Sequence, residues 1–230
     1  MSDRVYMADV AKYQDPTKIP WAVFVENGVL MGICKSSMGG GFDKNCDGHV
    51  AAMKDGGAKT GLYHWVDPTQ DWFQQAIYFL RKIEQHEPDA IAYDIEQWWA
   101  NWQLWSEYNQ GLRPGSDVPR IPVSQWIDCI NTFREVMRAE TDYEQNARAL
   151  DYSARWVLQL YPDLIPHVKD LQQWMAYYVL SGTPRKVTWE QLHTIPADGA
   201  RPGLPPGIDE ELWWQFSSLL ILPGVNFRLD

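Results

Sequence analysis

Cysteine is scarce in this 230-residue chain, and positive charge is outnumbered by negative charge. The three cysteines, Cys34, Cys46 and Cys129, are odd in number and form no Cys-x-x-Cys pair. We therefore expect buried free thiols and no disulfide framework. Twenty Lys and Arg stand against thirty Asp and Glu, for a net charge of −10. Because no basic run offers a phosphate-binding surface, the composition argues against nucleic-acid binding.

Long hydrophobic runs are also missing. No stretch approaches the ~18 consecutive apolar residues that a transmembrane helix needs, so no membrane association is expected. The N-terminus has no basic segment followed by an apolar one, and hence no visible signal peptide. We expect a protein that is made in the cytoplasm and reaches any external substrate by another route.

Motifs for metals, phosphates and nucleophilic serine are absent or incomplete. The five histidines show no paired ligand spacing, and no Gly-x-Ser-x-Gly elbow occurs. Gly39–Gly41 is not followed by the Gly-Lys-Ser/Thr of a phosphate-binding loop. The segment 43–48 copies half of an EF-hand, but Lys54 stands where the loop requires a bidentate Glu. We therefore expect no metal and no cofactor, and assign residues 43–48 to a loop and helix cap.

Aromatic residues are abundant, with thirteen Trp and eleven Tyr. They suit either a protein core or platforms that stack on sugar rings. Apolar residues make up 45% of the chain and charged ones 22%, which is ordinary for a globular protein. With no internal repeat or low-complexity linker, residues 1–230 are expected to form a single domain, and we expect a monomer.

The order of predicted elements is strand, helix, strand, helix, which is typical of a parallel sheet with crossover helices. Strands are expected at residues 5–10, 29–35, 60–65, 90–96, 148–152, 172–178, 212–216 and 225–229. Helices are expected at residues 21–26, 44–56, 68–86, 123–138 and 154–160. Residues 36–41 read as a glycine-rich loop, residues 97–111 as a tryptophan-rich stretch without clear pattern, and residues 183–207 as mostly loop.

The strand at 90–96 carries the clearest chemical signal. Its period of two places Ala90, Ala92, Asp94 and Glu96 on one face and three bulky residues, Ile91, Tyr93 and Ile95, on the other. In a parallel barrel the small face points to the centre, and both carboxylates lie at the carboxyl end, where barrel active sites open. Their Cα atoms would lie ~6.5 Å apart.

Two carboxyl groups this close raise each other's proton affinity, so one can stay protonated and act as an acid. A lone Asp-x-Glu can equally be two solvated acids at a strand end. Asp9 repeats the arrangement, since it is the last inward residue of the first predicted strand.

Six segments together resemble glycoside hydrolase family 25, the Chalaropsis-type lysozymes that include many phage endolysins. Asp9-Val10-Ala11-Lys12-Tyr13-Gln14 is similar to the family's Asp-Val-Ser-x-Tyr-Gln, and Tyr93-Asp94-Ile95-Glu96 to its Leu-Asp-x-Glu. The other four segments are Ile33–Gly39, Gly61–Trp65, Trp174–Tyr178 and Trp213–Ser218, with a closing acid at Asp230. The matches occur in the family's order and span almost the whole chain.

The resemblance implies a flattened TIM-like α/β barrel of eight strands with about five helices. It also implies hydrolysis of the β-1,4 bond between N-acetylmuramic acid and N-acetylglucosamine in bacterial peptidoglycan, with retention of configuration. Glu96 would be the general acid and base, and Asp94 would stabilise an oxazolinium or attack directly, with Asp9 and Asp230 as further acids. Substrate contacts would come from Tyr63, Lys35, Tyr178, Gln215 and Tyr152. A phage-encoded enzyme would reach the wall through a holin.

The sequence departs from the family pattern at three positions. Ala8 and Ala11 stand where Gly and Ser are usual, and Met38 replaces a Glu. Residues 97–150 exceed the family's usual length, and Tyr152 cannot be aligned uniquely. Two alternatives to a muramidase stay open: an inert carbohydrate-binding barrel, and a different barrel hydrolase, chitinase-like or metal-dependent.

Overall fold

We analysed a computed structural model of the chain. It describes residues 6–176, 186–188, 213–215 and 219–221. Across these ranges, no helix has the length and apolar character needed to cross a membrane.

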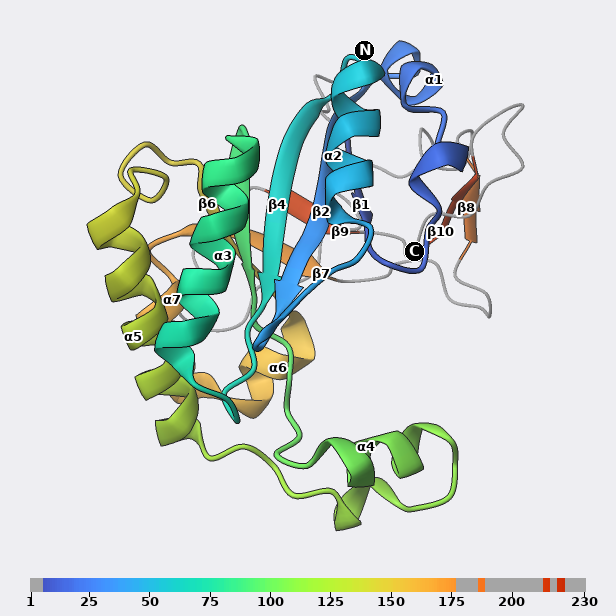
Figure 1. The fold of residues 1–230 in the computed structure, drawn as a ribbon. Helices are drawn as coiled ribbons and strands as arrows, with labels where there is room; N and C mark the ends of the chain where they lie inside the picture. Colours follow the sequence, from blue (N-terminus) through green and yellow to red (C-terminus); the bar gives the residue numbers. More distant parts are fainter. Residues whose placement is uncertain (1–5, 177–185, 189–212, 216–218, 222–230) are drawn as a thin grey trace, which may run out of the picture.

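A curled, mostly parallel sheet forms the centre of the molecule (Figure 1). Seven of its strands are parallel and follow the order β1-β2-β4-β5-β6-β7-β9, while β3 pairs antiparallel with β2. The strands are β1 (Tyr6–Val10), β2 (Val29–Met38), β3 (Gly41–Phe42), β4 (Lys59–Trp65), β5 (Ala90–Asp94), β6 (Ala149–Ala154), β7 (Gln172–Ala176) and β9 (Trp213–Gln215). A separate parallel pair joins β8 (Lys186–Thr188) to β10 (Leu219–Ile221).

Seven α-helices lie within the described ranges, against the five or so expected. They are α1 (Trp21–Glu26), α2 (Cys46–Asp55), α3 (Trp72–His86), α4 (Trp102–Asn109), α5 (Val123–Glu140), α6 (Arg155–Leu160) and α7 (Ile165–Val168). Single 3₁₀ turns occupy Pro16–Lys18, Gly115–Asp117 and Pro162–Leu164. The two unexpected helices are α4 and the four-residue α7. The expected barrel-type α/β fold is confirmed.

The alternation predicted for the central strand is confirmed. Ile91, Tyr93 and Ile95 belong to the large core between the sheet and the helices, whereas Ala92 belongs to a small interior cluster with Ile33, Leu150 and Trp174. The interior is crowded, since a Cβ added to Gly61 would lie 2.9 Å from the Ile33 side chain. Small residues therefore let the strands curl inward.

Several expected boundaries are wrong, and the central strand ends at Asp94, two residues before its predicted end at Glu96. Residues 36–38, assigned to a glycine-rich loop, continue β2, because β4 pairs with it as far as Met38 after a register shift near Ser36. The third helix begins at Trp72, four residues later than expected. Asp71 caps it by accepting a hydrogen bond from the Gln74 amide, and residues 68–70 fold as a turn against Asp67.

The stretch 97–111 was expected to be irregular, yet it contains α4. We call residues 97–121 the α4 arm, because they leave the barrel after β5 and project beyond its lower end in Figure 1. The arm's base is closed by antiparallel contacts: the Ala100 amide donates to Pro119, and the Ile121 amide donates to Trp98. Of the eight expected strands, only residues 225–229 lie outside the described ranges.

Candidate active site

The carboxyl ends of the parallel strands gather the candidate residues at one end of the sheet. The arrowheads of β2 and β4 point to this end, where the α4 arm projects (Figure 1). The strand register pairs Lys35 with Tyr63, Trp65 with Asp94, and Asp94 with Tyr152. Electrostatic effects of Asp9 reach Tyr63, Asp94 and Glu96. Six predicted site residues therefore lie around one interior site: Asp9, Lys35, Tyr63, Asp94, Glu96 and Tyr152.

The backbone around the two carboxylates is fixed on both sides. The Val66 amide donates to the Asp94 carbonyl at 3.0 Å, and the Ile95 amide donates to the Tyr152 carbonyl at 2.8 Å. The Ser153 hydroxyl donates to the Ile95 carbonyl at 2.8 Å. Hydrogen bonding thus continues beyond the last residue of β5 and holds the chain on which Glu96 stands.

Gln97, the next residue, is fully buried and makes hydrogen bonds to several segments. Its side-chain amide donates to Asp67 and to the Trp99 carbonyl, and its side-chain oxygen accepts from the Trp65 indole. The Trp126 indole donates to the Gln97 carbonyl. Glu96 therefore lies between two fixed residues, which preorganises its carboxyl group.

The buried carboxylate of Asp67 organises this side of the site. It accepts hydrogen bonds from the backbone and hydroxyl of Thr69, the side-chain amides of Gln70 and Gln97, and the indole of Trp102. These donors come from the loop before α3, from the end of β5 and from α4. One carboxylate thus joins the base of the α4 arm to the barrel.

Both central carboxyl groups favour their protonated forms. Burial raises the pKa of Glu96 to about 7; the Lys35 ammonium opposes this rise and the Asp9 charge adds to it. Burial also raises the pKa of Asp94 well above its usual value, and the Glu96 charge adds to that effect. Asp94 is only 3% exposed, and its Oδ1 has no hydrogen-bond partner among the described residues. Burial and mutual repulsion thus act in the same direction on both carboxyl groups and favour their protonated forms.

The physical cause differs in part from the one expected from sequence. We expected mutual repulsion between Asp94 and Glu96 to raise the pKa of Glu96. Burial is the largest cause for both groups, the expected repulsion between Asp94 and Glu96 adds to it, and the Asp9 charge contributes further. The outcome is still a carboxyl group that is a competent acid near neutral pH.

Lys35 provides the positive charge of the site. Its Nζ lies 4.3 Å from the centre of the Trp65 ring and 4.0 Å from the Met38 sulfur. Among the described residues it makes no ion pair, and burial lowers its pKa against the opposing effect of Asp94 and Glu96. Met38, where the family usually has a Glu, thus leaves the Lys35 charge to act on the central pair.

Tyr63 and Tyr152 flank the carboxyl pair. Burial, with Asp9 and Asp94 adding to it, raises the pKa of Tyr63 well above its usual value, so its hydroxyl stays protonated and can donate. Tyr152 packs edge-on against Trp174, with ring centres 4.6 Å apart, in the small interior cluster. The uncertain placement of Tyr152 from sequence is thereby resolved in favour of the interior.

Three predicted site residues cannot be placed in the same way. Tyr178 and Asp230 lie outside the described residues. Gln215 ends β9, where its backbone pairs with Ala176, and nothing is described of its side chain. Their roles stay predictions.

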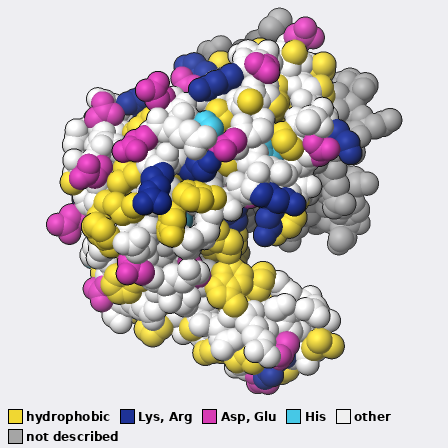
Figure 2. Space-filling view, in the orientation of Figure 1, with side chains coloured by type: hydrophobic (Ala, Val, Ile, Leu, Met, Phe, Trp, Pro, Cys, Tyr) yellow, Lys and Arg dark blue, Asp and Glu magenta, His cyan; other side chains and the backbone are white. Residues whose placement is uncertain are grey.

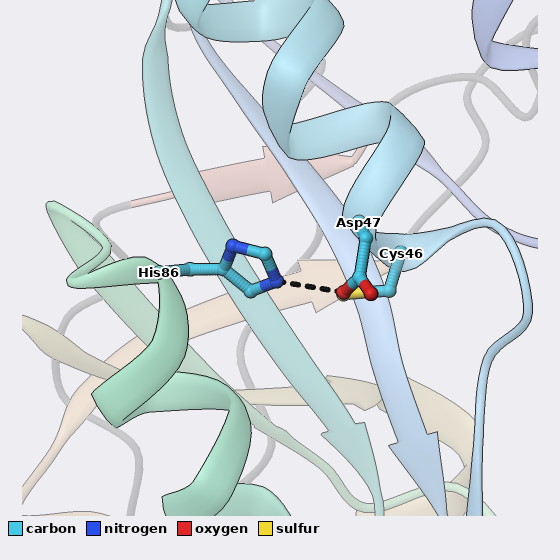
Figure 3. Close-up of side chains that lie close together, drawn as sticks. All are labelled: Cys46, Asp47 and His86. Atoms are coloured by element: carbon cyan, nitrogen blue, oxygen red, sulfur yellow. Dashed lines mark hydrogen bonds and ion pairs between the residues drawn. The ribbon is translucent and has the colours of Figure 1, made fainter.

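Only one group of His, Cys, Asp and Glu side chains in the described residues could hold a metal ion: Cys46, Asp47 and His86 (Figure 3). It lies between α2 and α3, and Cys46 belongs to the outer core, on the opposite side of the sheet from Asp94. Lys82 and His86 both donate to Asp47. Because an ammonium already neutralises this carboxylate, the group resembles a salt bridge more than a metal site.

The incomplete EF-hand is a structural loop, as expected. Asp43 accepts hydrogen bonds from the backbone amides of Lys12 and Asn45. Asn45 in turn donates to the Lys12 and Gln14 carbonyls. These contacts hold the loop after β1 against the start of α2.

Sequence reasoning missed two groups. Trp65, beneath Lys35, could have been found, because it occupies the inward position two residues after Tyr63 on the same strand. Asp67 gave no local signal, since its partners Gln97 and Trp102 are 30 and 35 residues away.

Comparison with known proteins agrees with this arrangement. The glycosyl hydrolases family 25 pattern matches residues 8–225. A bacterial lysozyme from Streptomyces coelicolor is similar in fold, with a TM-score of 0.69 and 18% identity, covering 100% of this chain and 91% of the other. A muramidase from Acremonium alcalophilum gives a TM-score of 0.65 at 15% identity, covering 94% of this chain and 88% of the other.

The catalytic domain of the endolysin ply40, from bacteriophage P40 of Listeria monocytogenes, gives a TM-score of 0.61 at 16% identity, covering 100% of this chain and 93% of the other. No curated protein sequence matched the chain. The similarities to solved structures support the fold, and the family match confirms the resemblance inferred from the six segments. The chain therefore belongs to family 25 of the glycosyl hydrolases and is a glycoside hydrolase.

Proposed function

We propose that this enzyme is an N-acetylmuramidase that hydrolyses the β-1,4 bond between N-acetylmuramic acid and N-acetylglucosamine in bacterial peptidoglycan, with retention. The observation that carries the proposal is the pair formed by the buried Asp94, at the end of β5, and the partly buried Glu96 just after it, in which the pKa of Glu96 is raised to about 7. Family membership supports it, as do the lysozyme, muramidase and endolysin among similar structures.

In the proposed mechanism, Glu96 donates its proton to the glycosidic oxygen as the bond to the anomeric carbon breaks. The 2-acetamido oxygen attacks that carbon and forms an oxazolinium, whose positive charge the Asp94 carboxylate stabilises; direct attack by Asp94 is the other route. Glu96, now ionised, accepts a proton from water, which attacks the same carbon and leaves it in its original configuration. Glu96 is thereby reprotonated.

The remaining residues have supporting roles in this proposal. The positive charge of Lys35 favours the ionised forms of Asp94 and Glu96, and the negative charge of Asp9 favours their protonated forms. Tyr63 and Tyr152 would contact the sugar, together with Tyr178 and Gln215, while Asp230 would be a further acid at the rim. The acting form is proposed to be a monomer that works without a cofactor on glycan strands.

Mass spectrometry of fragments released from purified peptidoglycan tests the proposal directly. The expected products carry N-acetylmuramic acid at the new reducing end. Products with reducing N-acetylglucosamine, or cleavage of chitin but not peptidoglycan, would replace it with a different glycosidase. A wall that is bound but not cut would indicate an inert binding barrel.

Removal of metal ions is expected to leave activity intact. The reaction above uses carboxyl groups alone, and the Cys46–Asp47–His86 group lies behind the sheet. The measurement is peptidoglycan hydrolysis after dialysis against EDTA, with a mock-dialysed sample as control. Loss of activity that added metal restores would contradict the mechanism.

The charges around Glu96 predict opposite shifts of the pH profile. Activity should fall on the alkaline side as Glu96 loses its proton near pH 7. Lys35 lowers the pKa of Glu96 and Asp9 raises it, so Lys35→Met should move this limb to higher pH and Asp9→Asn to lower pH. The measurement is kcat/KM against pH for the three proteins. If the alkaline limbs of Lys35→Met and Asp9→Asn moved in the same direction, another group would control the profile.

We also propose that the enzyme is made in the cytoplasm and acts at the bacterial cell wall, with release through a holin if a phage encodes it. Expression in a bacterium with and without a co-expressed holin, with lysis as the readout, tests it. Lysis that does not depend on the holin would overturn it.

A further inference from the structure

The α4 arm and α6 enclose a surface pocket of about 1170 Å³ that the proposed mechanism does not use. Figure 2 shows a hollow between the arm and the rest of the molecule, with hydrophobic side chains at its inner end. The pocket's walls combine three aromatic side chains with polar ones. They include Trp98, Tyr108, Ser116 and Arg120 from the arm, and Trp156 and Gln159 from α6.

The aromatic rings are available to a ligand. Trp156 is 51% exposed and Tyr108 is 41% exposed, while Trp98 is partly buried. Trp98 and Tyr108 meet edge to face, with ring centres 6.0 Å apart. Single exposed aromatic residues are common on protein surfaces. Three around one pocket form the kind of apolar surface against which sugar rings pack.

Among the residues that the structure describes, Arg120 is the only charged one in the pocket wall. It is exposed, and among the described residues it forms no ion pair, whereas nearby Arg113 pairs with Glu107 and Asp117. In a chain with a net charge of −10, an unpaired guanidinium beside aromatic rings favours a ligand that carries carboxylates.

The pocket wall is held by hydrogen bonds in the absence of a ligand, and it begins shortly after β5. The Trp98 carbonyl accepts hydrogen bonds from the Ile121 amide and the Tyr161 hydroxyl, which join the arm to the segment after α6. Trp98 follows Glu96 by only two residues. Two residues of chain span at most about 7 Å, so the backbone of the pocket wall begins close to Glu96.

We propose that this pocket is an accessory binding site for peptidoglycan, in which a sugar ring of the strand packs on Trp156 and Tyr108 while a stem-peptide carboxylate pairs with Arg120. The inference rests on the proposed substrate. It gives the long segment after β5 a function: holding the polymer at a distance from the cleavage point. The ligand class is thus an acidic, peptide-bearing glycan.

The test measures binding apart from catalysis. In the Glu96→Gln background, Trp156→Ala and Arg120→Gln are added to the full chain and co-sedimented with purified peptidoglycan. We expect each to weaken binding about tenfold, which corresponds to about 1.4 kcal/mol. Phe73→Ala, which removes an equally exposed aromatic side chain from α3, should leave binding unchanged. Trp156→Phe should retain most of the binding, which guards against a folding defect.

Two further experiments identify the bound ligand. After an amidase removes the stem peptides, Arg120→Gln should bind as well as its parent, while Trp156→Ala should still bind weakly. With Glu96 intact, hydrolysis of a short peptide-free glycan should change less than twofold in either variant. If Trp156→Ala and Arg120→Gln bound intact peptidoglycan as well as the Phe73→Ala control, the inference would be overturned. If the pocket variants bound peptidoglycan weakly but the wild-type enzyme released no muropeptides, the muramidase proposal would be refuted and the binding site would stand.

Discussion

Glu96→Gln is expected to lower the rate of peptidoglycan hydrolysis by about 10²–10⁴, the usual contribution of a positioned acid or base. Gln keeps the shape of the side chain but can neither donate a proton to the leaving oxygen nor accept one from water. The alkaline limb near pH 7 should also disappear from the residual activity, because Glu96 is the group whose pKa is raised to that value. The measurement is kcat/KM on soluble muropeptide polymers across pH 5–9.

Stability provides the control for this variant. The folded protein holds Glu96 at a pKa of about 7, against an ordinary 4.5, so the ionised form destabilises the fold as pH rises from about 4.5 through 7. Glu96→Gln should therefore unfold at a higher temperature than the wild type at pH 8, and at a similar temperature at pH 4. Glu84→Gln, at an exposed position of α3, should change neither rate nor stability. Near wild-type hydrolysis by Glu96→Gln would refute the assignment of the acid.

Asp94→Asn is expected to lower the rate by about 10²–10³, because it removes the only charge placed to stabilise the oxazolinium. Asn has nearly the same shape, and Asp94 is buried with an unpartnered Oδ1, so the fold should tolerate the change. Unlike Glu96→Gln, this variant should keep an alkaline limb, but at lower pH than in the wild type, because the negative charge of Asp94 no longer opposes ionisation of Glu96. Burial is the largest cause of the raised pKa of Glu96, and the substitution leaves burial unchanged.

The matched control is Asp55→Asn, at an exposed position near the end of α2. It removes one negative charge from the chain without touching the site. Addition of azide distinguishes the two routes for Asp94, since a small anion can restore a missing nucleophile. A full rate in Asp94→Asn would show that the 2-acetamido group needs no carboxylate partner.

Sequence patterns of short period predicted the central strand correctly. The two faces of residues 90–96 follow from a period of two, which is a local property of any strand. The same reasoning placed Asp9 at a strand end, whereas Lys35 and Tyr63 were predicted from the family resemblance. Helix α4 was missed although Trp102, Trp105 and Tyr108 lie at helical spacing; none of its residues is buried, so it does not pack on the core as the predicted helices do.

Contacts between distant segments could not be predicted in this way. The pKa of Glu96 depends on burial by the whole barrel, and no neighbouring residue in the sequence reveals it. Asp67 lies in a turn that looks ordinary, and only the fold brings Gln97 and Trp102 to it. The residues proposed to perform the chemistry were thus visible in the sequence, whereas those that hold them in place were not.

The attachment of the α4 arm to Asp67 has a consequence for how this enzyme could diversify. The part of the arm near the barrel is tied to the residue that follows the acid, so substitutions there would disturb catalysis. The far part, residues 106–117, is held by its own pairs between Arg113, Glu107 and Asp117. Substitutions, insertions or deletions in residues 106–117 would therefore leave the position of Glu96 unchanged. Selection for a different bacterial wall could therefore act on the tip alone, with the chemistry inherited unchanged.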